Sequence, residues 1–131
     1  MLILKYLLAA KKKNSFELLN YGNHYRDFTY IDDAVKICIS LQKKKMKKKF
    51  DIFNICSSKP ILITKVLEEI NKYSKKPLII EKPRDSADVY KTYGDNKKIR
   101  NFLKKKIKFT SNKQGVKNTC NWFLKNNKIF E

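Results

Sequence analysis

The residues best suited to chemistry lie in the segment 25–33, which reads YRDFTYIDD. Arg26 is one of only three arginines in a chain that otherwise takes its positive charge from lysine. A guanidinium fork binds the oxygens of a diphosphate in pairs, whereas a lysine acts there as a point charge. The alternative is an ordinary surface ion pair between Arg26 and Asp27 or Asp51, which would contribute little. The surrounding segment leads us to favour phosphate binding.

Two adjacent carboxylates, Asp32 and Asp33, close this segment. Paired carboxylates can act as acid and base, but neighbours at the start of a helix point in different directions. We therefore expect one of them to cap a helix and to face the positive end of its macrodipole. That helix is amphipathic, because Ile31, Ala34, Val35, Cys38 and Leu41 recur at helical spacing.

Tyr93 and Lys97 have the Tyr-x-x-x-Lys spacing of a proton-transfer pair. With seven tyrosines and a lysine at roughly one position in five, chance alone supplies such a pair. We interpret this one as non-catalytic. The chain holds three glycines, Gly22, Gly94 and Gly115, so the clustered glycines that cradle a dinucleotide are missing.

Hydrophobic spacing and turn residues predict alternating helices and strands, which favours an α/β fold. Residues 43–49 form a lysine-rich connector, and 81–88 form a charged loop. The capping residues Asp95 and Ser111, the latter with Gln114, indicate where two later helices begin. The helices are expected at 2–13, from about 31, from about 64, after 95 and after 111, and the strands at 16–21, 50–56 and 78–80. The apolar run 50–56 is typical of a strand covered on both faces of a parallel sheet.

Length and composition limit the possibilities further. At 131 residues the chain is long enough for one domain, 1–131, with a modest core. Its net charge of +19 suggests a polyanionic partner, but the scarcity of arginine disfavours nucleic acid. Three separated cysteines, Cys38, Cys56 and Cys120, predict reduced, mostly buried thiols in a cytoplasmic protein. The apolar segment 1–10 is too short to span a membrane and lacks a cleavage site, so we expect no membrane association.

Several ordered segments together resemble the C-terminal portion of the extended short-chain dehydrogenase/reductases, the NAD-dependent epimerase/dehydratase family. These segments are 20–23 (NYGN), 25–33, 53–55 (FNI), 88–89 (DV) and 92–95 (TYGD). The likeness is strongest to UDP-glucuronate 4-epimerases and spans nearly the whole chain. It implies an α/β nucleotide-sugar-binding lobe with the last helix and strand of a Rossmann-type sheet, without the cofactor-binding half.

The resemblance also implies site residues. Arg26 matches the arginine that grips the diphosphate of the sugar nucleotide. Leu19 and Tyr21 match the stretch that recognises the uracil edge, although an ordinary strand with a half-buried tyrosine explains them nearly as well. Asp88 matches the acidic residue that contacts the ribose, with Ala87 in place of the usual glycine, and Arg84 is a weaker candidate for the phosphates.

From this we expect the UDP-sugar-binding part of an NAD-dependent 4-epimerase for surface polysaccharide precursors, truncated or split and inactive alone. The parent family uses NAD, and none is expected to bind this chain alone. The expected partners are a UDP-sugar and either a separate N-terminal Rossmann half or a second copy. The alternatives are a nucleotide-sugar dehydratase fragment, a decayed remnant, and a small basic module for nucleic acid or an anionic surface.

Overall fold

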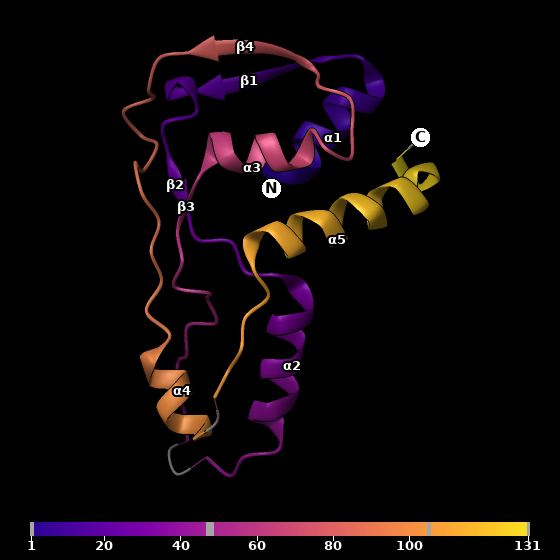
Figure 1. Ribbon diagram of the computed structural model, residues 1–131. Helices are drawn as coiled ribbons and strands as arrows, with labels where there is room; N and C mark the ends of the chain where they lie inside the picture. The colour runs from indigo at the N-terminus through magenta and orange to yellow at the C-terminus, as the bar shows by residue number, and fades with distance from the viewer. Residues whose placement is uncertain (1, 47–48, 105, 131) are drawn as a thin grey trace.

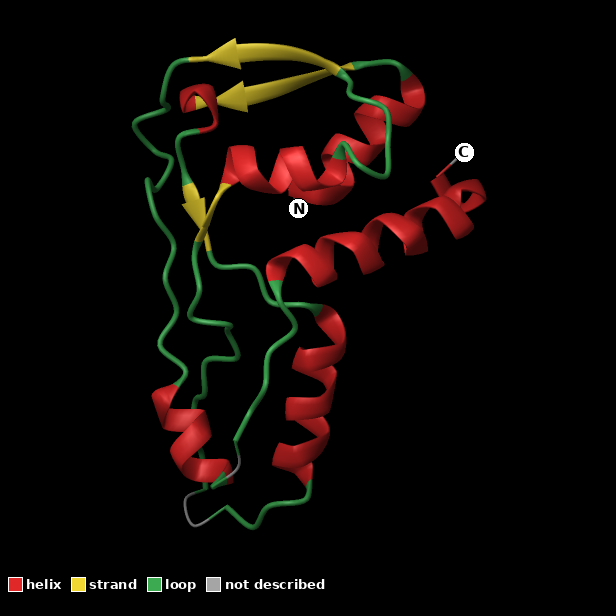
Figure 2. Cartoon of the chain, in the orientation of Figure 1, coloured by secondary structure: helices red, strands yellow, loops and turns green. Residues whose placement is uncertain are grey.

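The computed structural model describes residues 2–46, 49–104 and 106–130, and shows a mixed α/β fold in two parts (Figure 1). Figure 2 shows a two-stranded sheet over helices at one end and two further helices at the other, joined by long extended segments. The elements in chain order are α1 Leu2–Lys12, β1 Ser15–Leu19, the 3₁₀ turn η1 Asn20–Gly22, β2 Tyr25–Arg26, α2 Ile31–Gln42, β3 Ile61–Leu62, α3 Ile63–Ile70, β4 Leu78–Lys82, α4 Lys97–Leu103, α5 Asn112–Lys125 and η2 Asn127–Phe130.

The larger part is built on the parallel pair β1–β4, in which Phe16 lies opposite Ile79. Helices α1, α3 and α5 lie below this sheet (Figure 1). Their apolar faces meet in one core, in which Tyr6, Leu7 and Ile70 are fully buried. Burial of these faces removes apolar surface from water, which is the main stabilising contribution to such a fold.

The smaller part packs α2 against α4 and the extended segments between them. Ile37, Ile99 and Leu103 form its buried centre, and Phe53 and Phe102 pack beside it with ring centroids 4.9 Å apart. The short antiparallel pair β2–β3, in which Arg26 lies opposite Ile61, joins this part to the larger one. The residues that follow β2 therefore connect both cores.

Two predictions about this smaller part are wrong. Residues 50–56 do not form a strand, and Phe50 and Ile52 are 75% and 65% exposed. The predicted apolar face of α2 is also exposed at Ile31 and Val35, while Ile37 is buried instead. The first departure has a physical reason: a parallel strand needs neighbours, and no other strand of the described residues lies beside this segment.

The helices begin close to the predicted positions, but two of the three predicted capping residues do not occupy the N-cap. Tyr30 occupies the N-cap of α2 without a side-chain bond, so neither Asp32 nor Asp33 caps it. Asp33 is instead buried and accepts hydrogen bonds from the Thr110 amide at 2.6 Å and its hydroxyl at 3.1 Å. Asp95 accepts a hydrogen bond from the Lys97 amide, but the N-cap position of α4 is occupied by Asn96, one residue later than predicted. Ser111 caps α5 as predicted by accepting from the Gln114 amide.

Three smaller expectations are also resolved. The predicted strand 16–21 ends at Leu19 and gives way to η1. All three cysteines are free, but Cys38 is exposed, so the expectation of mostly buried thiols fails there. The lysine-rich connector is exposed at 43–46 and at 49, while 47–48 lie outside the described residues.

Candidate functional site

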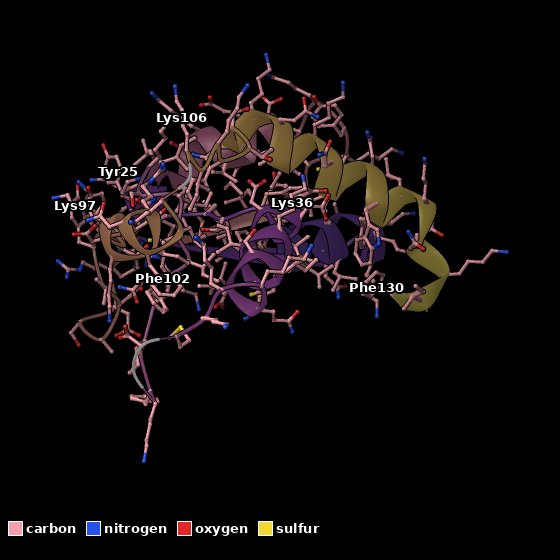
Figure 3. All side chains as sticks on the ribbon, turned by 90° about the horizontal axis from the view of Figure 1, so that it is seen from below. Tyr25, Lys36, Lys97, Phe102, Lys106 and Phe130 are labelled. Atoms are coloured by element: carbon pink, nitrogen blue, oxygen red, sulfur yellow. The ribbon has the colours of Figure 1, made fainter. Side chains whose placement is uncertain are left out.

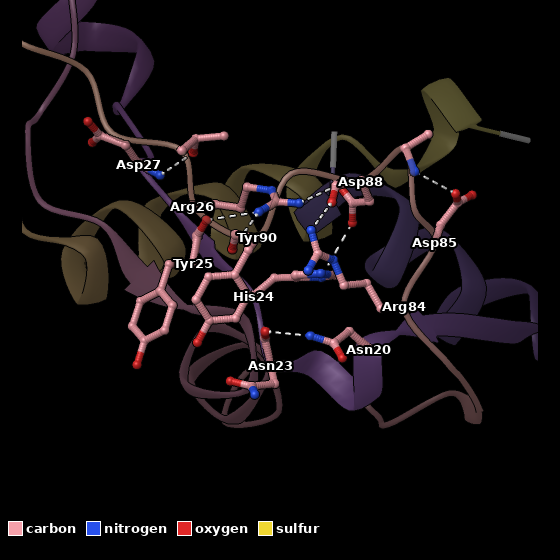
Figure 4. A network of polar contacts seen from close by, with 12 residues as sticks. Asn20, Asn23, His24, Tyr25, Arg26, Asp27, Arg84, Asp85, Asp88 and Tyr90 are labelled. Carbon is pink, nitrogen blue, oxygen red and sulfur yellow. Dashed lines mark hydrogen bonds and ion pairs between the residues drawn. The ribbon is translucent and has the colours of Figure 1, made fainter.

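The candidate site forms where β2 runs beside the segment 90–92. The Tyr25 amide donates to the Tyr90 carbonyl at 3.0 Å, and the Thr92 amide donates to the Tyr25 carbonyl at 3.1 Å. Parallel backbone pairing of this kind fixes the register of the two segments. It therefore brings Asp88, 62 positions away in sequence, next to Arg26 (Figure 4).

Arg26 lies at the centre of a network of polar contacts. Its Nη2 donates to Asp88 Oδ1 at 2.6 Å, and its Nη1 donates to the carbonyls of Tyr25 at 2.9 Å and Tyr90 at 3.3 Å. A guanidinium has five N–H donors. Among the described residues, Nε and one hydrogen of Nη2 make no hydrogen bond, so two donors stay available to a ligand.

The alternative of a surface ion pair between Arg26 and Asp27 or Asp51 does not hold, because Arg26 pairs with Asp88. Asp51 pairs with Lys98 across the smaller part of the molecule. Asp27 instead ties three segments together: it accepts from the Ser57 hydroxyl at 2.5 Å, the Ser58 amide at 3.0 Å and the Gly94 amide at 3.1 Å. Within the motif, the aspartate thus holds the neighbouring segments together, while the arginine bonds Asp88.

His24 joins the network from the other side of Asp88. The imidazole is 3% exposed, and its Nδ1 lies 3.4 Å from Asp88 Oδ2. Its Nε2 is buried and has no hydrogen-bond partner among the described residues. An unpartnered buried polar atom is uncommon in folded proteins and calls for an explanation.

A cavity of about 440 Å³ lies between these residues, α1 and β1. Its charged and polar lining includes Arg26, Asp88, His24, Thr92 and Lys5. Apolar side chains, Phe16, Phe28 and Ile63 among them, form the rest of the wall. Such a mixture of apolar wall and few polar groups is typical of a small-molecule site.

The structure brings three of the five predicted site residues to this cavity. Arg26, Leu19 and Asp88 line it, while Tyr21 and Arg84 do not. Tyr21 is 59% exposed, and its backbone lies in the left-handed region with φ 53°. Arg84 reaches the network indirectly, donating to the Asp88 carbonyl at 3.4 Å. His24 and Lys5 were missed, because neither residue carries a sequence signal that points to the cavity.

The other chemical candidates do not converge. Tyr93 is 65% exposed, and the Lys91 ammonium lies over its ring. The glycines lie apart, with Gly22 in η1, Gly94 against Cys56 and Gly115 inside α5. Gly94 lies three positions before α4, but it stands alone there and is packed against Cys56. A dinucleotide cradle needs several clustered glycines at the start of a helix, so these glycines do not fit one.

The described residues offer neither a metal-binding cluster nor a helix that could span a membrane. No group of histidine, cysteine or acidic side chains among them could hold a metal ion. Within the same residues, no helix combines the length and apolar character needed to cross a bilayer.

Comparison with known proteins identifies what the chain resembles. Residues 1–56 match the sequence model of the NAD dependent epimerase/dehydratase family. The chain is 42% identical to the uncharacterised protein MJ1055 of Methanocaldococcus jannaschii, over 93% of this chain and 36% of that protein. It is 31% identical to UDP-glucuronate 4-epimerase 3 of Arabidopsis thaliana, over 90% of this chain and 30% of that protein.

Solved structures share the fold. The UDP-glucuronic acid 4-epimerase of Bacillus cereus, solved with UDP-glucuronic acid and NAD, superposes with a TM-score of 0.81 at 18% identity. That superposition covers 95% of this chain and 40% of the other. The chain thus spans about a third of the length of its curated relatives. On the family match, these relatives and the shared fold, the chain belongs to the NAD-dependent epimerase/dehydratase family.

Proposed function

We propose that this chain is the UDP-sugar-binding part of a nucleotide-sugar 4-epimerase of the UDP-glucuronate type. The observation that carries the proposal is Arg26, which lines a cavity and keeps two N–H donors for a ligand. Two donors on one planar group match two oxygens of a diphosphate. The names of the relatives, UDP-glucuronate 4-epimerases among them, support the same ligand class.

The other contacts of the nucleotide follow from the cavity lining. Asp88 is 29% exposed and offers a carboxylate to a ribose hydroxyl. Leu19 ends β1 at the cavity, where backbone groups beside it can meet the uracil edge, with Tyr21 two positions further. Arg84 contacts Asp88 from outside and is proposed to assist the phosphates.

Hydride transfer is assigned to residues outside this chain. A 4-epimerase oxidises the sugar at C4 and reduces it from the other face, which takes a dinucleotide cradle and a proton-transfer pair. The glycines and Tyr93 of this chain do not supply them. We propose that NAD is bound by an α/β half on another segment or chain, and that this chain alone turns over no substrate. Three free cysteines support a cytoplasmic setting.

Exposed apolar surface supports such a partner half. Ile31, Val35 and Ile39 form a stripe along α2 and are 64%, 47% and 46% exposed. Phe50 and Ile52 are exposed on the extended segment nearby. Apolar patches of this kind mark interaction surfaces. Val35→Glu with Ile39→Glu should abolish association with an α/β half, or with a second copy, in size-exclusion chromatography. Unchanged association would show that the stripe is no interface.

Isothermal titration with UDP-glucose tests the ligand proposal. Arg26→Lys keeps the charge and loses the fork, so we expect Kd to rise about tenfold, which equals about 1.4 kcal/mol. Lys36→Ala removes an exposed charge on α2, away from the cavity, and should leave Kd unchanged (Figure 3). An absence of wild-type binding, or equal losses in both variants, would contradict the proposal.

The basic-module alternative predicts a different result. Nitrogen-tipped side chains project around the whole outline in Figure 3, and lysines occur on α1, α2, α3, β4, α4 and α5. A scattered charge binds polyanions weakly, and the binding falls steeply with salt. RNA retained on a filter at physiological salt would favour the basic module over the UDP-sugar site.

A further inference from the structure

His24 lies at the junction of the proposed diphosphate site and has no role assigned above. It is the single histidine of the chain. Its ring is buried edge-on against the Tyr90 ring, with centroids 6.2 Å apart. Each carboxylate oxygen of Asp88 has a neighbour: Oδ2 lies 3.4 Å from His24 Nδ1, and Oδ1 lies 2.6 Å from Arg26 Nη2.

A diphosphate in this cavity changes the balance of charge. It adds two negative charges beside Arg26, whose guanidinium already neutralises Asp88. The diphosphate and the Asp88 carboxylate then compete for the Arg26 guanidinium, and like charges at such distances repel. A second cation on the far side of Asp88 would relieve this repulsion.

His24 is suited to become that cation. Histidine changes its charge between pH 5 and 8. The other charged groups that line the cavity are Lys5 on α1, Glu17 on β1, Arg26, Asp27 and Asp88. Side chains of these types ordinarily keep their charge over that range.

The proton has a defined destination on the ring. Nδ1 is the ring nitrogen that faces the Asp88 carboxylate. With one hydrogen placed there, a second proton goes to Nε2. Nε2 is the buried atom without a partner among the described residues. His24 lines the cavity, but Nε2 itself is buried, so the side chains around it must shift for a proton and a ligand oxygen to reach it.

We propose that His24 is a positioning residue that takes up one proton from solvent when a nucleotide diphosphate binds. The imidazolium then holds Asp88 in place while the diphosphate engages Arg26. The inference rests on the proposed function and extends it to the proton balance of binding. Because the complex holds the proton more tightly, affinity is highest below the titration midpoint of free His24. The gain is lost as pH rises through the midpoint of the complex.

The single histidine makes the experiment direct, because its ring signals in ¹H–¹⁵N spectra need no assignment. The full chain is titrated from pH 5.5 to 8.5, alone and saturated with UDP-glucose, whose diphosphate is a diester and keeps its charge throughout. We expect the midpoint of the His24 titration to rise by about one pH unit in the complex, and Kd to be about tenfold lower at pH 5.5 than at pH 8. An unchanged midpoint with ligand bound would overturn the proposal.

A matched variant separates this role from a structural one. His24→Asn keeps an amide donor near the position of Nδ1 but cannot take a proton. We expect it to bind UDP-glucose with a Kd that does not vary with pH and stays near the weaker wild-type value at pH 8. A wild-type pH dependence in this variant would assign the proton to another group and refute the proposal. If the variant does not fold, the wild-type ring titration still decides.

The two proposals fail differently. If UDP-glucose does not bind at any pH, the proposed function fails and takes this inference with it. If it binds while the His24 midpoint stays fixed, only the role of His24 is wrong.

Discussion

Replacing Asp27 with asparagine tests how the motif divides its work between binding and architecture. The Asp27 carboxylate accepts four hydrogen bonds: Oδ1 from the Ser57 hydroxyl and the Lys59 amide, Oδ2 from the amides of Ser58 and Gly94. An asparagine turns one of these oxygens into an NH₂ group, which then faces two donors. Two hydrogen bonds to a charged acceptor are lost, at about 1.5–3 kcal/mol each.

We therefore expect Asp27→Asn to lower the free energy of unfolding by about 3 kcal/mol or more, a large part of the 5–15 kcal/mol typical of a domain. The melting temperature should fall by about 10 °C. Urea unfolding followed by circular dichroism measures this as a lower midpoint with an unchanged m-value. Asp32→Asn is the control, since Asp32 is exposed and should change stability by less than about 0.5 kcal/mol. A variant at position 27 within 1 kcal/mol of wild type would refute the reasoning.

Three further predictions concern stability. Asp33→Ala removes both hydrogen bonds from Thr110 and should lower the free energy of unfolding, measured in urea, by about 3 kcal/mol. A loss below about 1 kcal/mol would contradict the role assigned to Asp33. Gly94→Ala places a Cβ against both Sγ and Cβ of Cys56, so we expect a loss of about 1–3 kcal/mol. The double variant with Cys56→Ala should relieve only part of this loss, because the Cβ of residue 56, 2.7 Å away, remains. Equal stability of wild type and Gly94→Ala would refute the close contact. Burial raises the pKa of the Cys120 thiol to about 11, above the value near 8.5 of an unfolded thiol. Stability should therefore fall as pH rises from about 8.5 to 11, by at most about 3 kcal/mol, and Cys120→Ala should lose this dependence in parallel unfolding curves.

Much of the fold could be predicted because its signals are local. The spacing of Val66, Leu67 and Ile70 describes the buried face of α3 as the structure has it. Ser111 and Gln114 marked the start of α5 through a bond between near neighbours. Such features depend on a few adjacent residues and survive in any surroundings.

The failures involve residues whose partners lie elsewhere. The run 50–56 has the composition of a buried strand, but a strand requires a neighbour for its backbone groups. Ile31 and Val35 likewise have an apolar pattern without a surface to cover them in this chain. Asp33 was expected to bond locally and instead holds Thr110, 77 positions away.

The candidate site shows the same division. Arg26 could be singled out by residue type and by its motif. Its pairing with Asp88 across 62 positions depends on the register of β2 against the segment 90–92, which no short-range pattern encodes. The position of His24 beside Asp88 could not be predicted for the same reason.

The most direct measurement observes Arg26 itself. The chain has three arginines, Arg26, Arg84 and Arg100, so the Nε–H region of a ¹H–¹⁵N spectrum holds few signals and Arg26→Lys identifies one of them. Titration with UDP-glucose should shift the Arg26 Nε–H signal in a saturable manner, because that donor is proposed to take a diphosphate oxygen, and should leave Arg100, which bonds Asn96 and Ile107, unchanged. A stationary Arg26 signal at ligand concentrations that saturate binding by calorimetry would contradict the account.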